Sequence, residues 1–232
     1  MPGNSEELKV AIEVIYLKAS ELFSKNFSYF VFDRDSKDGV IIDPAGDLEQ
    51  IESHISDHHV NLSKVLLTHY HFDHVYLTNT LARRYNIQVL MNKIEIDYYG
   101  FNCRNLFAID DSETIFIGQC KVNVIHTPGH TKGSTCYLIG NNLFTGDTLF
   151  IEGCGLCFGE GANPNEMFDS LQQLKSRIDS HTFIYPGHSY GQGPGKRFDY
   201  LLKNNIYLQI DNRDHFVSFR MREKQYNLFA FK

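Results

Sequence analysis

The chain has 232 residues, a length that predicts one large domain or two small ones. An apolar fraction of 42%, with 18 Phe and 13 Tyr, supplies a core and excludes a disordered or fibrous chain. The net charge of −6 argues against nucleic acid as a partner, and no apolar run approaches the roughly 18 residues of a membrane span. Five cysteines and an N-terminus that does not resemble a secretory signal indicate a reducing compartment. We therefore expect a cytoplasmic protein with no membrane or nucleic-acid partner.

Apolar segments that predict strands alternate with helical spacing along most of the chain. The predicted strands are 10–17, 28–33, 39–43, 65–68, 87–91, 114–117, 121–126, 135–139, 142–145 and 182–185. The predicted helices are 48–58, 74–85, 93–98 and 164–178. Asn163 as cap and Pro164 at the first position mark the start of the last helix, and Gly140-Asn141 is the clearest hairpin turn. The pattern predicts an α/β body.

No Ser/Gly/Pro-rich linker divides this pattern, and no fixed-period repeat is present. The stretch 191–195 is the one candidate boundary, and the residues after it indicate a helix followed by a strand or a second helix. We expect a single domain over 1–232, with 191–232 as a C-terminal appendage.

A dense group of metal-ligand side chains follows the predicted strand 65–68. The segment THYHFDH, residues 68–74, holds four of them. Alternation places His69 and His71 on one side of the chain, while Asp73 and His74 reach a neighbouring point. Imidazole nitrogens and carboxylate oxygens are ligands for zinc and iron. The other interpretation is a polar loop that caps the next helix, but four ligands within six residues favour a metal site.

Three further positions lie just beyond predicted strands. They are His130 in TPGH, Asp147 in TGDT and His188 in PGH. A glycine beside each lets the backbone turn sharply and bring the side chain to a common centre. With the four ligands of segment 68–74 they make seven, which suits two metals that share one carboxylate.

These motifs resemble the metallo-β-lactamase superfamily, in its glyoxalase II-like branch. The resemblance covers roughly residues 10–190, and FTGDTLFIEGCG at 144–155 is especially close. It implies a four-layered αβ/βα sandwich with the metals at one edge, between two sheets. It also implies two zinc ions as cofactors, with iron or manganese as alternatives.

The resemblance also implies a role for each candidate ligand. His69, His71 and His130 would bind the first metal. The second metal would be bound by Asp73, His74 and His188, with Asp147 bridging the two. Asp43 matches a position that orients a ligand histidine. Asp73 would also be catalytic, by orienting a hydroxide that bridges the metals and attacks the substrate carbonyl.

Departures from the family pattern narrow the range of possible reactions and substrates. The commonest class B β-lactamases carry Cys or Ser in place of Asp147, so hydrolysis of antibiotics is disfavoured. Flavodiiron proteins carry Glu in place of His71, so oxygen reduction is disfavoured too. Glyoxalase II enzymes hold glutathione with a basic residue and often a Tyr, where this chain has Leu156 and Phe158. Leu cannot neutralise a carboxylate and Phe has no hydroxyl to donate. We expect Leu156, Phe158 and Tyr190 to bind substrate, and the thiol end not to be glutathione.

The segment GHSYG at 187–191 and the compact tail resemble small zinc hydrolases encoded with bacterial trans-acyltransferase polyketide synthases. Those are thought to cleave acyl groups from the phosphopantetheine arm of acyl carrier proteins. The resemblance therefore implies an acyl thioester substrate and an acyl carrier protein as partner. Because carrier proteins and this chain are both acidic, a basic pair, either Arg83 with Arg84 or Arg220 with Arg222, would have to meet the carrier.

Three alternatives remain from the sequence. The first is a hydroxyacylglutathione hydrolase of the glyoxalase II kind. The second is a persulfide dioxygenase with one iron held by His69, His130 and Asp147. The third is a metal-stabilised module that binds carrier proteins without turnover. Metal content and thioester cleavage distinguish them.

Overall fold

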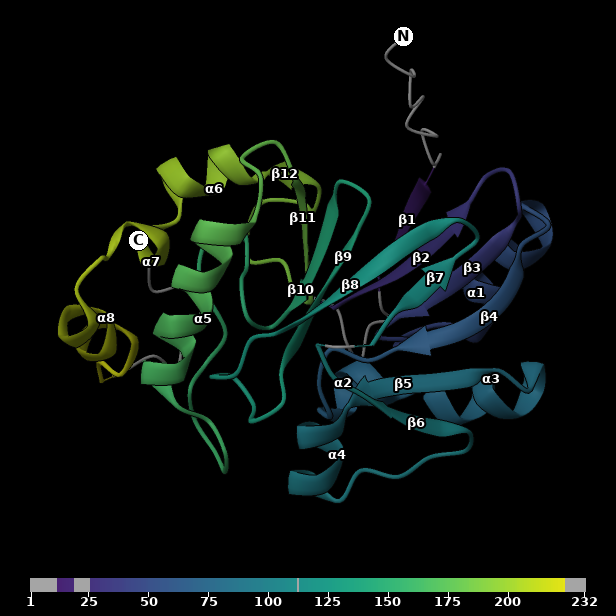
Figure 1. The fold of residues 1–232 in the computed structure, drawn as a ribbon, viewed down its shortest axis with the longest axis horizontal. Helices are drawn as coiled ribbons and strands as arrows, with labels where there is room; N and C mark the ends of the chain where they lie inside the picture. Colours follow the sequence, from purple (N-terminus) through teal and green to yellow (C-terminus); the bar gives the residue numbers. More distant parts are fainter. Residues whose placement is uncertain (1–11, 19–25, 112, 224–232) are drawn as a thin grey trace, which may run out of the picture.

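Two six-stranded sheets face each other in the computed structural model, and helices cover the outer face of each (Figure 1). The structure describes residues 12–18, 26–111 and 113–223. The predicted four-layered αβ/βα sandwich is confirmed.

The first sheet has the strand order β1-β2-β3-β4-β5-β6. Its strands are β1 (Ile12–Lys18), β2 (Phe27–Asp33), β3 (Asp38–Ile42), β4 (Asn61–Leu66), β5 (Gln88–Asn92) and β6 (Leu106–Ile109). The first three pair antiparallel, and β3 to β6 pair parallel. The parallel strands are connected through α1 (Leu48–Asp57), α2 (Phe72–Val75), α3 (Thr78–Tyr85) and α4 (Lys93–Tyr99).

The second sheet has the order β12-β11-β10-β9-β8-β7. Its strands are β7 (Ile115–Ile117), β8 (Cys120–His126), β9 (Thr135–Ile139), β10 (Asn142–Gly146), β11 (Phe183–Pro186) and β12 (Lys196–Arg197). Only β10 and β11 pair parallel, because α5 connects them. The helices of this half are α5 (Pro164–Arg177), α6 (Phe198–Asn204), α7 (Ile206–Gln209) and α8 (Arg213–Arg220).

Three apolar clusters bind these layers together, and β2 takes part in two of them. Its Val31 points into the cluster between the sheets, with Phe144 of β10. Its Phe30 points the other way, into the cluster that also holds Leu81 of α3. Because neighbouring strand residues face opposite sides of a sheet, a strand buried on both faces needs apolar residues in succession, as at 29–32 of β2. The third cluster joins the second sheet to α5 and the C-terminal helices.

Most predicted elements are present, with ends shifted by a few residues. Asn163 caps α5, and the β9–β10 hairpin turns at Gly140, whose φ is +58°. The first two residues of the predicted strand 10–17 lie outside the described residues. Within the described residues, no helix is long and apolar enough to cross a membrane.

One prediction about the elements was wrong. The predicted helix 74–85 is broken into α2 and α3, and the backbone N–H of Leu77 donates to the carbonyl oxygen of Pro44 instead of continuing the helix. After 195, a helix followed by a strand or a second helix was expected. The described residues form α6, α7 and α8 after the two-residue β12, which agrees with the second of these options. The sequence analysis also missed β6.

The C-terminal helices pack on α5. Phe198, Tyr207 and Phe216 are buried in the same cluster as Leu171 and Leu174 of α5. The division of the chain into one domain with residues 191–232 as an appendage stays a prediction.

Candidate metal centre

The seven predicted ligands lie together at one edge of the sandwich. Four follow β4, His130 follows β8, Asp147 follows β10 and His188 follows β11. The neighbouring strands β10 and β11 run parallel and therefore end at the same edge. The backbone N–H of Thr135 donates to the carbonyl oxygen of Thr68, which joins the two sheets at this point. Strand ends from both sheets thus deliver the side chains to one place.

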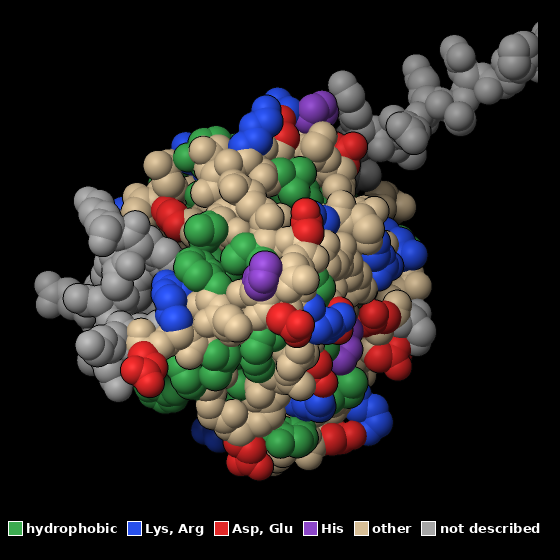
Figure 2. Space-filling view, turned by 90° about the vertical axis from the view of Figure 1, so that its left-hand side faces the viewer, with side chains coloured by type: hydrophobic (Ala, Val, Ile, Leu, Met, Phe, Trp, Pro, Cys, Tyr) green, Lys and Arg blue, Asp and Glu red, His purple; other side chains and the backbone are tan. Residues whose placement is uncertain are grey.

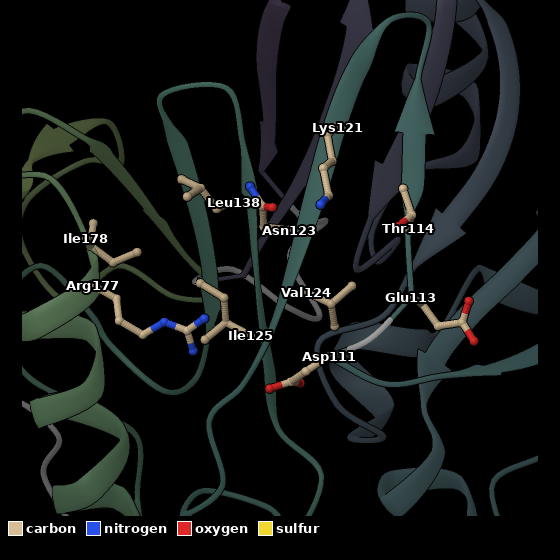
Figure 3. A pocket seen from close by; sticks show the side chains of 10 residues that line it. All are labelled: Asp111, Glu113, Thr114, Lys121, Asn123, Val124, Ile125, Leu138, Arg177 and Ile178. Atoms are coloured by element: carbon tan, nitrogen blue, oxygen red, sulfur yellow. The ribbon is translucent and has the colours of Figure 1, made fainter.

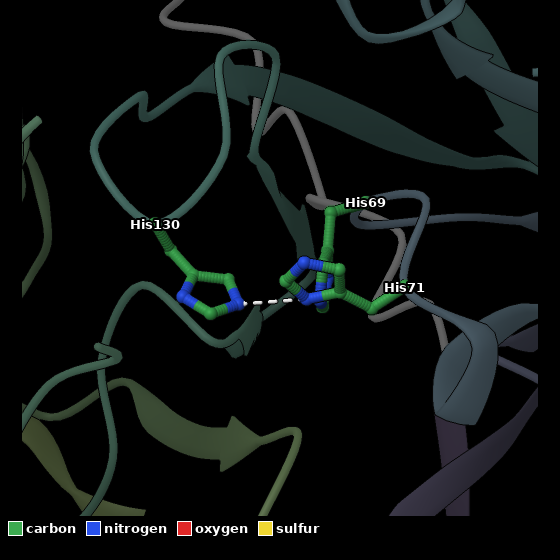
Figure 4. Close-up of side chains that lie close together, drawn as sticks. All are labelled: His69, His71 and His130. Atoms are coloured by element: carbon green, nitrogen blue, oxygen red, sulfur yellow. Dashed lines mark hydrogen bonds between the residues drawn. The ribbon is translucent and has the colours of Figure 1, made fainter. Parts of the chain in front are cut away.

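The first group consists of three histidines (Figure 4). His71 Nδ1 lies 3.0 Å from His69 Nε2 and 3.0 Å from His130 Nε2. His130 Nδ1 is 2.7 Å from the carbonyl oxygen of Leu156, so it donates there and leaves Nε2 as the free nitrogen. One nitrogen of each ring therefore faces a common point, which is an arrangement that can hold a metal ion.

The second group consists of Asp73, His74 and His188. His74 Nε2 is 3.3 Å from His188 Nε2, and His188 Nε2 is 3.5 Å from Asp73 Oδ2. His74 is fully buried, whereas the Asp73 side chain is one-third exposed. The buried edge of this group meets the first group, and its open edge faces the surface.

Asp147 lies between the two groups. Its Oδ1 is 3.4 Å from His74 Nε2, and its Oδ2 is 3.2 Å from His188 Nε2 and 3.5 Å from His130 Nε2. Oδ1 is buried and has no hydrogen-bond partner among the described residues. A buried carboxylate oxygen without a donor is costly unless a cation satisfies it. Asp147 is therefore placed to bridge two ions.

The electrostatics of the first group and of Asp147 suit metal binding. Burial lowers the pKa of His69 and His130, and burial together with His130 lowers the pKa of His71 to about 4. These rings are neutral at pH 7, which is the form that binds metals. Although burial opposes it, His188 and His74 hold the pKa of Asp147 well below its usual range. Neutral imidazoles and an ionised carboxylate form the donor set that zinc prefers.

Asp43 orients histidines in both groups. Its Oδ2 accepts from the Thr68 hydroxyl at 2.6 Å, and Thr68 Oγ1 in turn accepts from His69 Nδ1 at 3.0 Å. The same Oδ2 lies 2.8 Å from His74 Nδ1. With burial working the other way, Asp147 and Asp43 raise the pKa of His74 to about 9. Asp43 adopts a φ of +48°, a strained backbone for a residue other than Gly and one that often marks functional sites.

Asn26 is a site residue that the sequence analysis missed. Its amide Nδ2 donates to Asp73 Oδ2 at 2.9 Å and to the Asp73 carbonyl at 2.8 Å. Asn26 also forms an isolated bridge with His188. It is 47 residues away from Asp73 in the chain, so no local motif could have indicated the contact.

Glycines allow the close approach of these loops. A Cβ on Gly187 would lie 2.4 Å from Asp147 Oδ1 and 2.6 Å from a ring carbon of His74. A Cβ on Gly155 would lie 2.0 Å from the carbonyl oxygen of Asp147. Any larger residue would displace the candidate ligands.

Two of the three predicted substrate-binding residues contact candidate ligands. The backbone of Leu156 contacts His130, and its side chain is half-buried. Phe158 is 55% exposed. The Tyr190 ring stacks on His188 at 6.0 Å and packs edge-on against Phe150 at 5.1 Å. Leu156 and Tyr190 therefore lie against ligand histidines, and the contact of all three residues with substrate stays a prediction.

The basic pair Arg220 with Arg222 is not a surface patch. Arg220 is only 2% exposed and donates to the Tyr207 hydroxyl at 2.7 Å. Arg222 donates to the carbonyl of Phe219. On the side of the molecule where α8 lies, Lys and Arg side chains are interspersed with Asp and Glu (Figure 2). The expectation for this pair was wrong, because the guanidinium groups hold the C-terminal helices together.

A separate hollow of about 220 Å³ opens beside the C-terminal end of α5 (Figure 3). Lys121 and Asn123 of β8 line it, together with Asp111, Glu113 and Arg177. It contains none of the candidate site residues.

Comparison with known proteins decides the family. The model of the metallo-beta-lactamase superfamily matches residues 23–188. The chain belongs to this superfamily. The match ends at His188, so it spans all seven predicted ligands.

The superfamily relatives of this chain include two Bacillus proteins. The probable polyketide biosynthesis zinc-dependent hydrolase BaeB of Bacillus velezensis is 44% identical over 95% of this chain and 98% of its own. The corresponding PksB of Bacillus subtilis is 46% identical over 89% of this chain and 92% of its own. A hydroxyacylglutathione hydrolase of Shewanella loihica is 34% identical over 73% of this chain and 64% of its own.

Solved structures agree with the fold. The crystal structure of ETHE1 from Myxococcus xanthus has a TM-score of 0.78 at 27% identity and covers 90% of both chains. The di-iron-bound form of TTHA1623 has a TM-score of 0.69 at 25% identity, covering 84% of this chain and all of that one.

Proposed function

We propose that this protein is a zinc-dependent hydrolase of acyl thioesters with two metal ions. The observation that carries the proposal is Asp147, whose carboxylate lies within 3.5 Å of histidines from both groups and has one buried oxygen without a partner. The names of BaeB and PksB, zinc-dependent hydrolases, support the metal and the reaction class. The di-iron form of TTHA1623 supports a site for two ions.

The donor set fits two such ions. His69, His71 and His130 would hold one, and Asp73, His74 and His188 the other, with Asp147 shared. When bound, the ions would supply a hydroxide near neutral pH and polarise a carbonyl group. The chain's own part is to orient the imidazoles, which Asp43, Thr68 and the Leu156 carbonyl do.

Asp73 is the residue placed to direct the attacking group. Its carboxylate is partly exposed and is held by the Asn26 amide, so its orientation is set before substrate arrives. Although burial opposes it, His74 and Asn26 lower the pKa of Asp73, which therefore stays ionised. A thioester suits such a site, because a thiol with a pKa of about 8.5 leaves as thiolate without a proton donor.

The thiol that carries the acyl group is, in this proposal, the phosphopantetheine arm of an acyl carrier protein in polyketide biosynthesis. The polyketide hydrolase names of BaeB and PksB support it. So do Leu156, Phe158 and Tyr190, none of which offers a positive charge to a glutathione carboxylate. The Shewanella relative favours a second candidate, hydrolysis of hydroxyacylglutathione.

Asp147→Asn tests the two-metal proposal. The amide keeps the shape of the side chain but removes the negative charge, so both ions should bind at least tenfold more weakly. Asp199→Asn is the control, since Asp199 is a partly exposed carboxylate on α6 whose partner is Arg197. Zinc content after dialysis and thioester cleavage should fall together in D147N and stay at wild-type level in D199N.

Two zinc ions retained by D147N would refute a shared carboxylate. One iron with oxygen consumption in the wild type would indicate the dioxygenase alternative.

A further inference from the structure

Glu95 is a buried carboxylate that neither the motifs nor the proposed metal ligands include. It lies in α4, a helix capped by Asn92 whose Lys93 and Asp97 form an ion pair on the exposed face. Glu95 lies on the opposite face and is completely buried. A charged side chain is rarely placed there unless several donors satisfy it.

Three donors from two separate loops satisfy Glu95. Oε1 accepts from the backbone N–H of Tyr70 at 2.9 Å. Oε2 accepts from the backbone N–H of Gly133 at 2.7 Å and from the Thr131 hydroxyl at 2.9 Å. The two oxygens of one carboxylate thus bind two different loops.

Both loops carry the histidines of the first group. Tyr70 lies between His69 and His71, and Thr131 directly follows His130. The second loop also packs tightly on α4, because a Cβ on Gly133 would lie 2.3 Å from the backbone nitrogen of Glu95. The distance between the two loops is therefore set where they share Glu95. Tyr70 and Thr131 are each one residue away from a histidine of the group, and Gly133 is three residues away from His130.

We propose that Glu95 is a positioning residue that holds the loops of His69, His71 and His130 at the separation which one metal ion requires. This inference rests on the proposed metal site and adds a residue to it. Groups that orient ligands without touching the metal typically change metal affinity by 10- to 100-fold when they are altered. Glu95 acts on the backbone of the ligand loops instead of on the rings.

Asp33 provides a matched control. It is also a buried carboxylate that accepts from a backbone N–H, that of Asp35 at 3.1 Å, and from a hydroxyl, that of Ser36 at 2.8 Å. Asp33 is the last residue of β2. The site lies near the opposite end of this strand, where the backbone N–H of Phe27 donates to the carbonyl oxygen of Gly187. Asp33→Asn should therefore lower thermal stability without changing zinc binding.

The test is a zinc titration of the full-length apoprotein against a chelator, with Glu95→Gln and Asp33→Asn beside the wild type. In E95Q an amide nitrogen replaces one of the two accepting oxygens of Glu95. This N–H donor would face the backbone N–H of one loop, so the hydrogen bond to that loop is lost. We expect one of the two zinc equivalents to bind 10- to 100-fold more weakly in E95Q and neither to change in D33N. Equal zinc affinities in E95Q and wild type would overturn the inference, because Glu95 would then only support the fold.

Thr131→Val keeps the test decisive if E95Q does not fold. This variant preserves the shape of the side chain and removes one of the three donors, so it should weaken the same zinc equivalent in the same direction. Unchanged affinity in T131V would then count against the inference. A wild-type protein that binds no zinc would contradict the proposed function itself, whereas zinc binding that E95Q leaves intact contradicts only the role of Glu95.

Discussion

At the residue scale, carboxylates gathered at the candidate metal centre favour the binding of cations there. The whole protein is also acidic, with a net charge of −6. The carboxylates of Asp43, Asp73 and Asp147 surround a set of buried imidazoles, and Asp147 and Asp43 favour positive charge at His74. Two divalent ions would neutralise these carboxylates more completely than a single proton can. The same arrangement makes the orientation of each carboxylate important, since a rotated oxygen would leave an ion without a ligand.

Asn26→Ala should lower turnover more than it lowers zinc content. The variant removes the amide that holds Asp73 Oδ2, but it leaves all seven candidate ligands in place. We expect kcat on an acyl thioester to fall about tenfold or more, as for other groups that orient a ligand, while KM changes little. Steady-state kinetics with parallel zinc analysis measures this. A rise in KM at constant kcat would show that Asn26 contributes to substrate binding instead.

Local motifs predicted the candidate ligands because those residues cluster in short segments next to strands, as in THYHFDH at 68–74. The structure brings all seven side chains together, and their binding of metal stays a prediction. Asn26 and Glu95 could not be predicted in this way. Each acts through a contact 25 or more residues away in the chain, which only the folded sheets create.

At the scale of elements, most strands could be predicted from the sequence because their apolar runs are buried on one or both faces. The break between α2 and α3 could not be predicted from the sequence, since residues 74–85 keep a helical apolar spacing. Tertiary contacts decide it: His74 is held by Asp43, and the Leu77 N–H is held by Pro44. β6 was missed because four residues, half of them exposed, show little pattern.

The C-terminal helices contribute to the position of the site through the segment that follows Asp147. The buried Asn205 amide donates to the carbonyl oxygens of Phe150 and Gly153, at 3.0 and 2.9 Å. That segment continues to Leu156, whose carbonyl orients His130. Packing of α7 and α8 on α5 therefore supports one side of the metal centre.

Phe216→Ala should destabilise the protein by about 3–5 kcal/mol, the usual cost of removing a buried Phe ring. Phe216 is fully buried and packs against Phe168 of α5 at 5.4 Å and against Tyr207 at 5.6 Å. Val217→Ala, at a partly buried neighbour, is the control and should cost less. Denaturant unfolding of both variants measures the difference. A loss below about 1 kcal/mol for F216A would mean that α8 is dispensable for the packing of this half.

At the scale of the whole molecule, the two sheets bring ligands from segments more than a hundred residues apart to one edge. The backbone of Leu156 contacts His130 and the Tyr190 ring stacks on His188. Leu156, Phe158 and Tyr190 are the residues by which the proposed function distinguishes the chain from hydroxyacylglutathione hydrolases.

S-D-lactoylglutathione should be a poor substrate. The chain has Leu156 and Phe158 where glutathione would need a cation and a hydroxyl, so the glutathione carboxylate would lose water without gaining a partner. We expect a kcat/KM well below the roughly 10⁴ M⁻¹s⁻¹ that is typical of enzymes with their own substrates. An efficiency at or above that value would favour the hydroxyacylglutathione candidate.

The most direct test of the proposed function compares one acyl group on two thiols, with the zinc-loaded protein. The first substrate carries it on the phosphopantetheine arm of an acyl carrier protein, and the second carries it on N-acetylcysteamine, the truncated end of that arm. Binding energy from the arm and the carrier would place the carbonyl in the site, so the carrier substrate should be hydrolysed with higher kcat as well as lower KM. D147N should be inactive on both. Equal rates on the two thioesters would contradict recognition of the carrier, and no hydrolysis of either by the zinc-loaded protein would contradict the thioesterase account.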